Sequence, residues 1–185
     1  MSTEERTAGL AYGSDATMFH AVHQGWGDVI CHSPDYDAFQ AVAATHLLAL
    51  DSAIAKSSLN KREVVWSGHG HGGGSRGALR GPPSAFLGLY YQYPGYISTS
   101  LARETAIESF LVKRTFSGSL PTLLEFRLPA DFPALDMSEV GHHGEFEILL
   151  GRSVEFRVID ASEFCHPKVR DTVLNLVLAP VLVPG

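Results

Sequence analysis

Between residues 33 and 56, apolar side chains return every three or four positions along the chain. Ser33 offers an N-cap, Pro34 suits the first helical position, and Lys56 places a cation near the helix C-terminus. This spacing predicts one long helix whose apolar face covers one side of a sheet. The apolar positions are Tyr36, Phe39, Val42, Ala43, His46, Leu47, Leu50 and Ile54.

After about residue 60 the pattern changes to short β-prone runs separated by glycine and proline. Pro180 lies near the end of the last run, which favours an edge strand or the terminus of a strand. A fold with helices early and strands later is predicted to be α+β, with mainly antiparallel pairing. The predicted strands are 63–66, 96–100, 123–128, 145–150, 154–159 and 172–181, with a helix over 101–112.

Residues 144–158 are predicted to form a β-hairpin. In its first strand Glu145 and Glu147 would share one face, and Phe146 and Ile148 would share the other, buried face. Two neighbouring carboxylates are a plausible catalytic device, because like charges push their pKa values apart. A solvated strand face is the commoner explanation of such a pair when it is considered alone.

Two glycine-rich or polar stretches carry no periodicity. Residues 1–16 are small and polar and are predicted to be a mobile arm, so that residues 17–185 form one domain. Residues 69–83 are predicted to be a loop and do not match a phosphate-binding P-loop. His69 and His71 could chelate a metal, but no third ligand is apparent, so we expect no metal site.

Composition narrows the classes of function. The chain has 185 residues, 45% of them hydrophobic and 18% charged, which fits one globular domain. A net charge of −6 argues against a nucleic-acid-binding surface. Two cysteines suit a reducing compartment, and no apolar run approaches the roughly 18 residues of a membrane span. The N-terminus lacks the apolar segment of a signal peptide, so we expect a cytoplasmic protein or an effector delivered into a target cell.

Three motifs occur in an order that resembles the mono-ADP-ribosyltransferases of the arginine–serine–glutamate class, which include bacterial toxins and injected effectors. The motifs are Trp66-Ser67-Gly68, Tyr96-Ile97-Ser98-Thr99-Ser100 and Glu145-Phe146-Glu147. The resemblance runs from about Leu47 to Val158. It implies an ADP-ribosyltransferase-like fold, with N-terminal helices packed on two mainly antiparallel β-sheets. It also implies NAD as co-substrate and a protein as the second substrate.

The resemblance gives each catalytic candidate a role. Glu147 would stabilise the positive charge that develops on the ribose as the nicotinamide bond breaks, a species close to that of glycoside hydrolysis. Ser98 would hold Glu147 in position by a hydrogen bond. Glu145 would orient or deprotonate the acceptor, and a glutamate at this place goes with arginine acceptors in the family. The loop over 136–144 would present that acceptor.

Cofactor contacts are implied in the same way for Ser67, Gly68, Thr99, Ser100 and Arg103. Thr99 and Ser100 would shape the nicotinamide pocket. Arg103 would reach a phosphate, although a solvated helix charge explains it equally well.

Ser67 departs from the family pattern, because an arginine that holds the NAD phosphates is usual there. A hydroxyl cannot replace the charge-assisted, bidentate hydrogen bonds of a guanidinium. Another cation (Arg76, Arg80 or Arg103) could supply the charge, or His69 could serve instead. Otherwise the chain is an impaired member of the class. The alternatives to a transferase are therefore a pseudoenzyme that binds a partner protein, or an NAD glycohydrolase that uses water as acceptor.

Overall fold

A computed structural model describes residues 1–14, 34–69, 81–112, 121–141, 146–169 and 172–181. Its helices are α1 (Thr3–Ser14), α4 (Pro34–Lys56), α5 (Arg103–Ala106), the π-helix η2 (Ile107–Val112) and the 3₁₀ turns η1 (Pro83–Phe86) and η3 (Met137–Val140). Its strands are β1 (Glu63–His69), β2 (Tyr90–Gln92), β3 (Ile97–Ser100), β4 (Thr122–Leu128), β5 (Ala134–Asp136), β6 (Glu147–Leu150), β7 (Glu155–Phe164) and β8 (Val173–Pro180).

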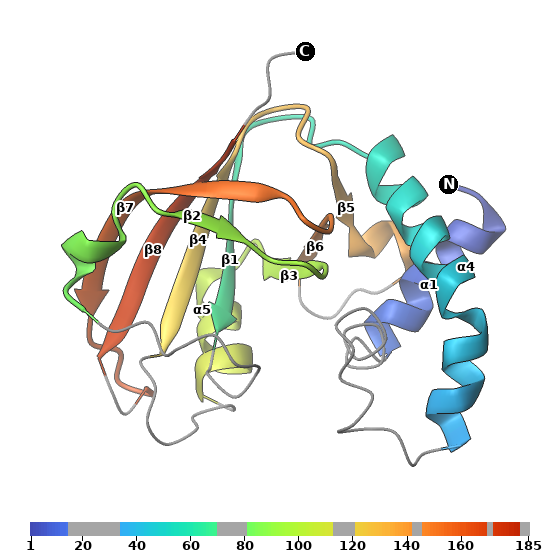
Figure 1. The fold of residues 1–185 in the computed structure, drawn as a ribbon, viewed down its shortest axis with the longest axis horizontal. Helices are drawn as coiled ribbons and strands as arrows, with labels where there is room; N and C mark the ends of the chain where they lie inside the picture. The colour runs from blue at the N-terminus through green and yellow to red at the C-terminus, as the bar shows by residue number, and fades with distance from the viewer. Residues whose placement is uncertain (15–33, 70–80, 113–120, 142–145, 170–171, 182–185) are drawn as a thin grey trace.

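The strands form one sheet in the order β2-β7-β8-β4-β1-β3-β6-β5, in which only β4 and β8 run parallel (Figure 1). The β1–β3 junction consists of a single pair in register, Trp66 with Ser100. This junction divides the sheet into a five-stranded part (β2-β7-β8-β4-β1) and a three-stranded part (β3-β6-β5). The α+β class with mainly antiparallel pairing is confirmed, and the two expected sheets are two parts of one sheet.

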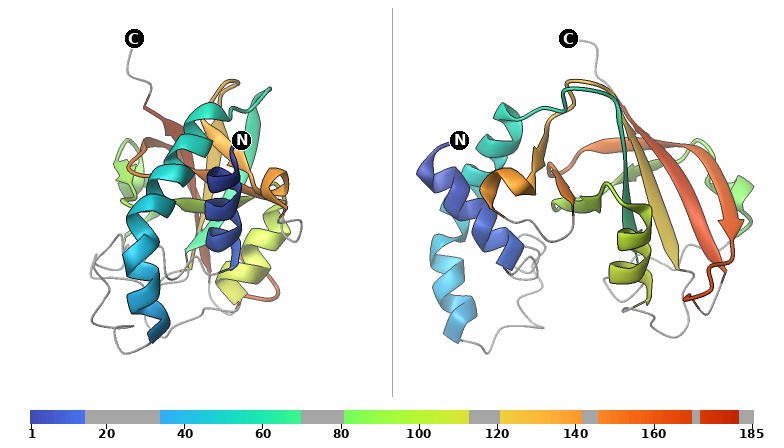
Figure 2. Two further views of the ribbon diagram at one scale, coloured as in Figure 1. Left: turned by 90° about the vertical axis from the view of Figure 1, so that its right-hand side faces the viewer. Right: turned by 180° about the vertical axis from the view of Figure 1, so that it is seen from behind.

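Three apolar clusters hold these layers together. The largest joins both parts of the sheet and includes Val65, Phe126, Phe156, Ile97 and Leu150. A second packs α1 and α4 on the three-stranded part, and a third packs η2 on the five-stranded part. Figure 2 shows α1 and α4 together at one end of the molecule, with α5 beside β1. The helices therefore contact different parts of the sheet.

Residues 3–14 are a packed helix, so the prediction of a mobile arm is wrong for them. The Ser2 backbone N–H donates to Glu5 Oε2 at 2.6 Å, and the Glu5 N–H donates to Ser2 Oγ at 3.2 Å. This reciprocal pair is a capping box, which satisfies two N–H groups at the helix start. One turn and two turns further on, Ala8 and Tyr12 are fully buried against the second cluster. Burial of this face fixes the helix on the domain.

Helix α4 confirms the periodicity argument, because it begins at Pro34 and ends at Lys56 as predicted. Leu50 and Ile54 on the predicted apolar face are buried. The predicted helix over 101–112 is also present, as α5 followed by the π-helix η2. Leu101 precedes it and is exposed rather than facing inward.

The prediction of a hairpin between β6 and β7 is wrong. β6 pairs with β3 and β5, whereas β7 pairs with β2 and β8, so residues 144–158 do not form a hairpin. Every residue of β6 is buried, because both faces of this strand are covered. β8 lies inside the sheet, between β4 and β7, and Pro180 is at its terminus, one of the two positions that the sequence favoured. Pro180 is tolerated there because it occupies the last position of the strand.

Candidate active site

The candidate site is centred on Glu147, the first residue of β6, whose side chain is buried at 7% relative exposure. Ser98 Oγ on β3 donates a hydrogen bond to Glu147 Oε1. Ser100 lies directly opposite Glu147 in the β3–β6 ladder, so Ser98, Ser100 and Glu147 share one face of the sheet. The hydrogen bond expected between Ser98 and Glu147 is therefore present, and it fixes the carboxylate at a strand end.

Tyr12 of α1 joins this group from a helix that the sequence patterns did not indicate. Its hydroxyl lies 3.2 Å from Ser98 Oγ. Burial raises the pKa of the Tyr12 phenol, the hydrogen bond to Ser98 lowers it, and the charge of Glu147 raises it further, with a net rise. The phenol therefore keeps its proton at neutral pH. A helix start at Ser2, with Ala8 and Tyr12 four residues apart, was the signal that could have revealed it.

Thr99 and Ser100 each make a hydrogen bond to a backbone group. Thr99 is buried, and its Oγ1 donates to the Ile148 carbonyl at 2.6 Å. Alternation along β3 directs Thr99 to the opposite face from Ser98 and Ser100. Ser100 Oγ accepts the Ala102 N–H at 3.1 Å, which fixes the turn into α5. The role of both residues toward a nicotinamide ring stays a prediction.

A polar network beside the site supports the start of β3. The Tyr96 hydroxyl donates to Asp51 Oδ1 at 2.8 Å and lies 3.1 Å from the Leu47 carbonyl oxygen of α4. Arg152 makes a two-pronged ion pair with Asp51, with its Nε 3.0 Å from Oδ1, and its guanidinium lies 5.5 Å from the Tyr96 ring centroid. Burial and the bond to Asp51 raise the pKa of Tyr96. The network joins α4, β3 and the β6–β7 connection.

Phe146 interrupts the strand that was predicted to carry both glutamates. Its φ is 51°, in the left-handed region, and its ring is 69% exposed rather than buried. Its carbonyl accepts the Leu101 N–H at 3.0 Å, which ties this turn to the end of β3. A left-handed aromatic residue costs about 1–2 kcal/mol and is typical of functional sites. Glu145 lies outside the described residues, so strand alternation no longer determines its direction relative to Glu147.

The remaining cofactor candidates are Ser67, Gly68 and Arg103. Ser67 is 4% exposed and pairs with Leu124 of β4, next to Gly68. Because Trp66 pairs with Ser100, alternation directs Ser67 away from the face of Ser100 and Glu147. The Arg103 guanidinium lies 4.5 Å from the Phe164 ring centroid and 3.7 Å from Glu104.

Several loop candidates cannot be placed. Arg76, Arg80 and His71 all lie outside the described residues. Within the part of the chain that is described, no three metal-ligating side chains come together. No helix in that part is long and apolar enough to cross a membrane.

The sequence profile of the ADP-ribosyltransferase exoenzyme family matches residues 79–181, which is more than half of the chain. The chain belongs to this family. The matched region includes β3 with Ser98 and β6 with Glu147. ADP-ribosyltransferases use NAD as co-substrate. No curated protein sequence matches the chain.

Solved structures of ADP-ribosyltransferases have the same fold as this family member. Plx2a, an ADP-ribosyltransferase toxin from Paenibacillus larvae, superposes with a TM-score of 0.71 at 18% identity, over 98% of this chain and 88% of its own. Exoenzyme S from Pseudomonas aeruginosa, in complex with human 14-3-3 protein beta and bound to Carba-NAD, gives 0.64 at 20% identity, over 97% and 74%. The ADP-ribosyltransferase Vis in complex with agmatine gives 0.62 at 14% identity, over 98% and 76%.

The residues around Glu147 suit the chemistry at the ribose end of NAD. Cleavage of the nicotinamide–ribose bond develops positive charge on the ribose, and a fixed carboxylate stabilises such charge. The Ser98 hydrogen bond keeps the Glu147 carboxylate in one orientation before the reaction. The guanidinium of Arg103, which follows the Ser-Thr-Ser strand, stacks on Phe164, and its contact with a phosphate stays a prediction.

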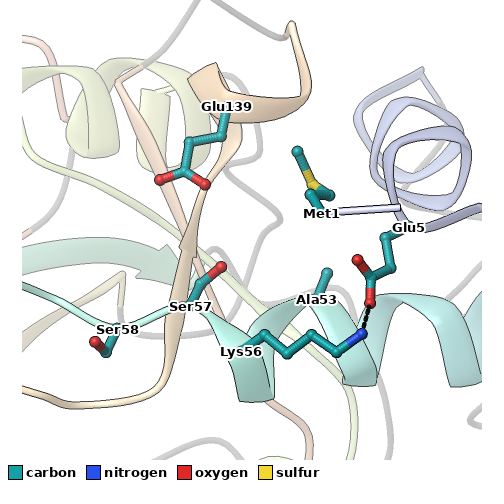
Figure 3. A pocket seen from close by; sticks show the side chains of 7 residues that line it. All are labelled: Met1, Glu5, Ala53, Lys56, Ser57, Ser58 and Glu139. Carbon is teal, nitrogen blue, oxygen red and sulfur yellow. Dashed lines mark hydrogen bonds and ion pairs between the residues drawn. The ribbon is translucent and has the colours of Figure 1, made fainter. Parts of the chain in front are cut away.

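A cavity of about 320 Å³ in this exoenzyme-family protein lies away from Glu147. It opens between the start of α1, the end of α4 and η3 (Figure 3). Figure 3 shows the Lys56 ammonium reaching the Glu5 carboxylate at its edge, a contact of 2.5 Å. None of the candidate catalytic residues is among its lining residues, which are Met1, Glu5, Ala53, Lys56, Ser57, Ser58 and Glu139. The cavity therefore belongs to the docking of α1 rather than to the candidate site.

Proposed function

We propose that this protein is an NAD-dependent mono-ADP-ribosyltransferase that modifies an arginine side chain of a target protein, as a bacterial toxin or effector delivered into another cell. The observation that carries the proposal is the Ser98–Glu147 hydrogen bond in a chain that belongs to the ADP-ribosyltransferase exoenzyme family. Family membership supplies the reaction class, and the fixed carboxylate supplies the group that this reaction requires.

In the proposed reaction the bond between ribose C1′ and the nicotinamide nitrogen breaks, and nicotinamide leaves with the electron pair. Glu147 stabilises the cationic ribose, and a guanidine nitrogen of the acceptor forms the new bond to C1′. Glu145 takes the proton that this nitrogen loses. The arginine assignment rests on the glutamate at position 145 and on the likeness to Vis, whose structure holds agmatine, a guanidine compound.

The test is transfer of labelled ADP-ribose from NAD to agmatine and to proteins of a cell extract. We expect labelling by the wild-type protein and a loss of about 10²–10³-fold in rate for Glu147→Gln, because one preorganised charge is removed. Glu155→Gln is the matched control, since Glu155 is exposed on β7 and its change should leave the rate unaltered. Equal labelling by wild type and Glu147→Gln would contradict the assignment.

Ser67 favours one further candidate, a pseudoenzyme that binds a partner protein without turnover, because the usual phosphate-holding arginine is absent at this position. Calorimetric titration with NAD separates the two. Micromolar binding of NAD supports the transferase, and no binding at millimolar NAD supports the pseudoenzyme. Free ADP-ribose that accumulates without any acceptor would instead indicate an NAD glycohydrolase.

A further inference from the structure

Tyr12 reaches the candidate site from helix α1, which lies outside the region that matches the family profile. We propose that Tyr12 is a positioning residue for the catalytic carboxylate, acting through Ser98 on the orientation of Glu147. The proposal rests on the proposed function for its catalytic consequence. Its structural part, a relay from α1 to β6, stands on the geometry of the described residues alone.

The direction of the relay follows from counting protons. A serine hydroxyl has one proton, and an ionised carboxylate can only accept. Ser98 therefore gives its proton to Glu147 Oε1, and the Tyr12 hydroxyl must be the donor in its contact with Ser98 Oγ. A hydroxyl that accepts one hydrogen bond donates a stronger one, because the two bonds polarise each other. Tyr12 thus both directs the Ser98 proton and strengthens its bond to Glu147.

Packing fixes the position of the Tyr12 hydroxyl. The side chain is 1% exposed, and its ring meets the Tyr96 ring edge-on, with centroids 5.6 Å apart. Helix α1 is held at its first turn by Glu5, which accepts hydrogen bonds from Lys56 and Ser52 of α4. A side chain with so little freedom can hold a partner within the tolerance that a catalytic group needs.

Gly9 lets α1 approach the sheet closely enough for this contact. A Cβ at this position would lie 2.8 Å from Val140 Cγ1 of η3, which is closer than side chains pack. Gly9 lies three residues before Tyr12, so the same close approach sets the height of the Tyr12 hydroxyl above β3. The relay therefore depends on helix α1, which precedes all three of the family motifs in the sequence.

Tyr12→Phe removes the hydroxyl and keeps the ring. One hydrogen bond of this kind corresponds to about a three- to tenfold change in rate. We expect kcat for ADP-ribosyl transfer to fall by that factor, with KM for NAD unchanged, because the relay acts on orientation of the carboxylate rather than on binding. Tyr96→Phe is the matched control: a buried tyrosine in the same cluster, whose hydroxyl contacts α4 and not Ser98. It should lower the melting temperature and leave kcat unchanged.

A double variant tests whether Tyr12 acts through Ser98. If it does, Tyr12→Phe in a Ser98→Ala background has no further effect on kcat, because the intermediate link is already gone. A tenfold additional loss would show that Tyr12 acts by another route and would overturn the relay. An unchanged kcat for Tyr12→Phe in an active wild-type background would overturn it as well.

An NMR titration of Glu147 tests the relay without enzymatic turnover, so its result does not depend on the proposed function. In protein labelled with ¹³C at glutamate carboxyl groups, the resonance of Glu147 is the one that Glu147→Gln abolishes. Loss of the relay weakens a hydrogen bond to the ionised form, so Tyr12→Phe should raise the pKa of Glu147 and Tyr96→Phe should not. If the wild-type protein is inactive but Tyr12→Phe raises the pKa of Glu147, the proposed function is contradicted and the relay is supported. If the wild-type protein is active and Tyr12→Phe leaves the pKa of Glu147 unchanged, the proposed function is supported and the relay is contradicted.

Discussion

The five-stranded and three-stranded parts of the sheet share one apolar cluster, but their other faces are built differently. The five-stranded part packs its other face on η2 through apolar residues such as Ile107, Leu111 and Leu123. The three-stranded part packs its other face on α1 and α4, and there a half-buried Ser98 and a buried Glu147 lie beside apolar neighbours. The second arrangement therefore holds a buried carboxylate and its hydrogen-bond partner on the helix-covered face.

This difference separates the residues that stabilise the fold from the residues that form the candidate site. A buried polar group costs free energy unless it is hydrogen-bonded, so the three-stranded part needs partners brought in by helices. Tyr12 from α1 and Asp51 from α4 are such partners. Changes in the five-stranded part should therefore alter stability, and changes to the groups that hold Glu147 in the three-stranded part should alter rate.

The largest expected effect is on stability, from Phe126→Ala in β4. The Phe126 ring is fully buried and meets Phe156 edge-on at 4.8 Å and Tyr91 at 6.4 Å. Removing such a ring leaves a cavity and should lower the free energy of unfolding by about 3–5 kcal/mol. Urea denaturation measures this loss, and Phe126→Leu should lose much less. A large fall in kcat of the still-folded variant would show that the two parts are not separable.

The next effect is on rate, from Ser98→Ala in β3. Without its hydrogen bond the Glu147 carboxylate is free to rotate, and we expect kcat to fall about 10–100-fold. Thr122→Val is the control, because it removes a buried hydroxyl from the five-stranded part instead. It should change the melting temperature and not kcat. Equal kcat in wild type and Ser98→Ala would show that the three-stranded part does not contribute to catalysis through this hydrogen bond.

Local sequence patterns predicted much of this organisation. The three- and four-residue spacing around Leu47 and Leu50 predicted α4, because an amphipathic helix needs only its own residues to be recognised. The strands that carry Ser98 and Glu147 were also predicted, because short β-prone runs are likewise recognised from their own residues. The pairing of those strands was not, because β6 joins β3 and β5 rather than the strand that follows it.

Tertiary contacts account for what the sequence patterns missed. Phe146 adopts φ of 51° against its intrinsic preference, because its carbonyl is bonded to Leu101 at the end of β3. Tyr12 and Ser98 are 86 residues apart, so no local pattern joins them. The capping box of Ser2 and Glu5 could have been recognised in the sequence, but residues 1–16 are small and polar and were therefore predicted to be a mobile arm.

A smaller effect should follow from Gly9→Ala in α1. The new methyl group meets Val140 and overpacks the contact, at a cost of about 1–3 kcal/mol, while helix propensity returns about 1 kcal/mol. We expect a small fall in melting temperature together with a fall in kcat, because Tyr12 moves away from Ser98. Gly9→Ala with Val140→Ala makes room for the methyl group and should restore kcat. A double variant as slow as the single one would contradict the docking argument.

The smallest effect concerns the attachment of α1 at acid pH. Hydrogen bonds from Lys56, the Ser2 backbone N–H and Ser52 lower the pKa of Glu5 to about 2. In the unfolded chain a glutamate titrates at about 4.3, so the folded state is stabilised above that pH. The stabilisation is lost as the pH falls from about 4.3 toward 2, because the folded carboxylate finally binds its proton.

Glu5→Gln lacks this titration. Wild type should therefore melt at a higher temperature than Glu5→Gln at neutral pH, and the gap should close as the pH falls below about 4.3. Glu139, which lines the same cavity, is the control position, and Glu139→Gln should show no such closing gap (Figure 3). A gap for Glu5→Gln that stays constant down to pH of about 2.5 would mean that α1 is held by its apolar face alone, and Ala8 and Tyr12 would then carry the attachment.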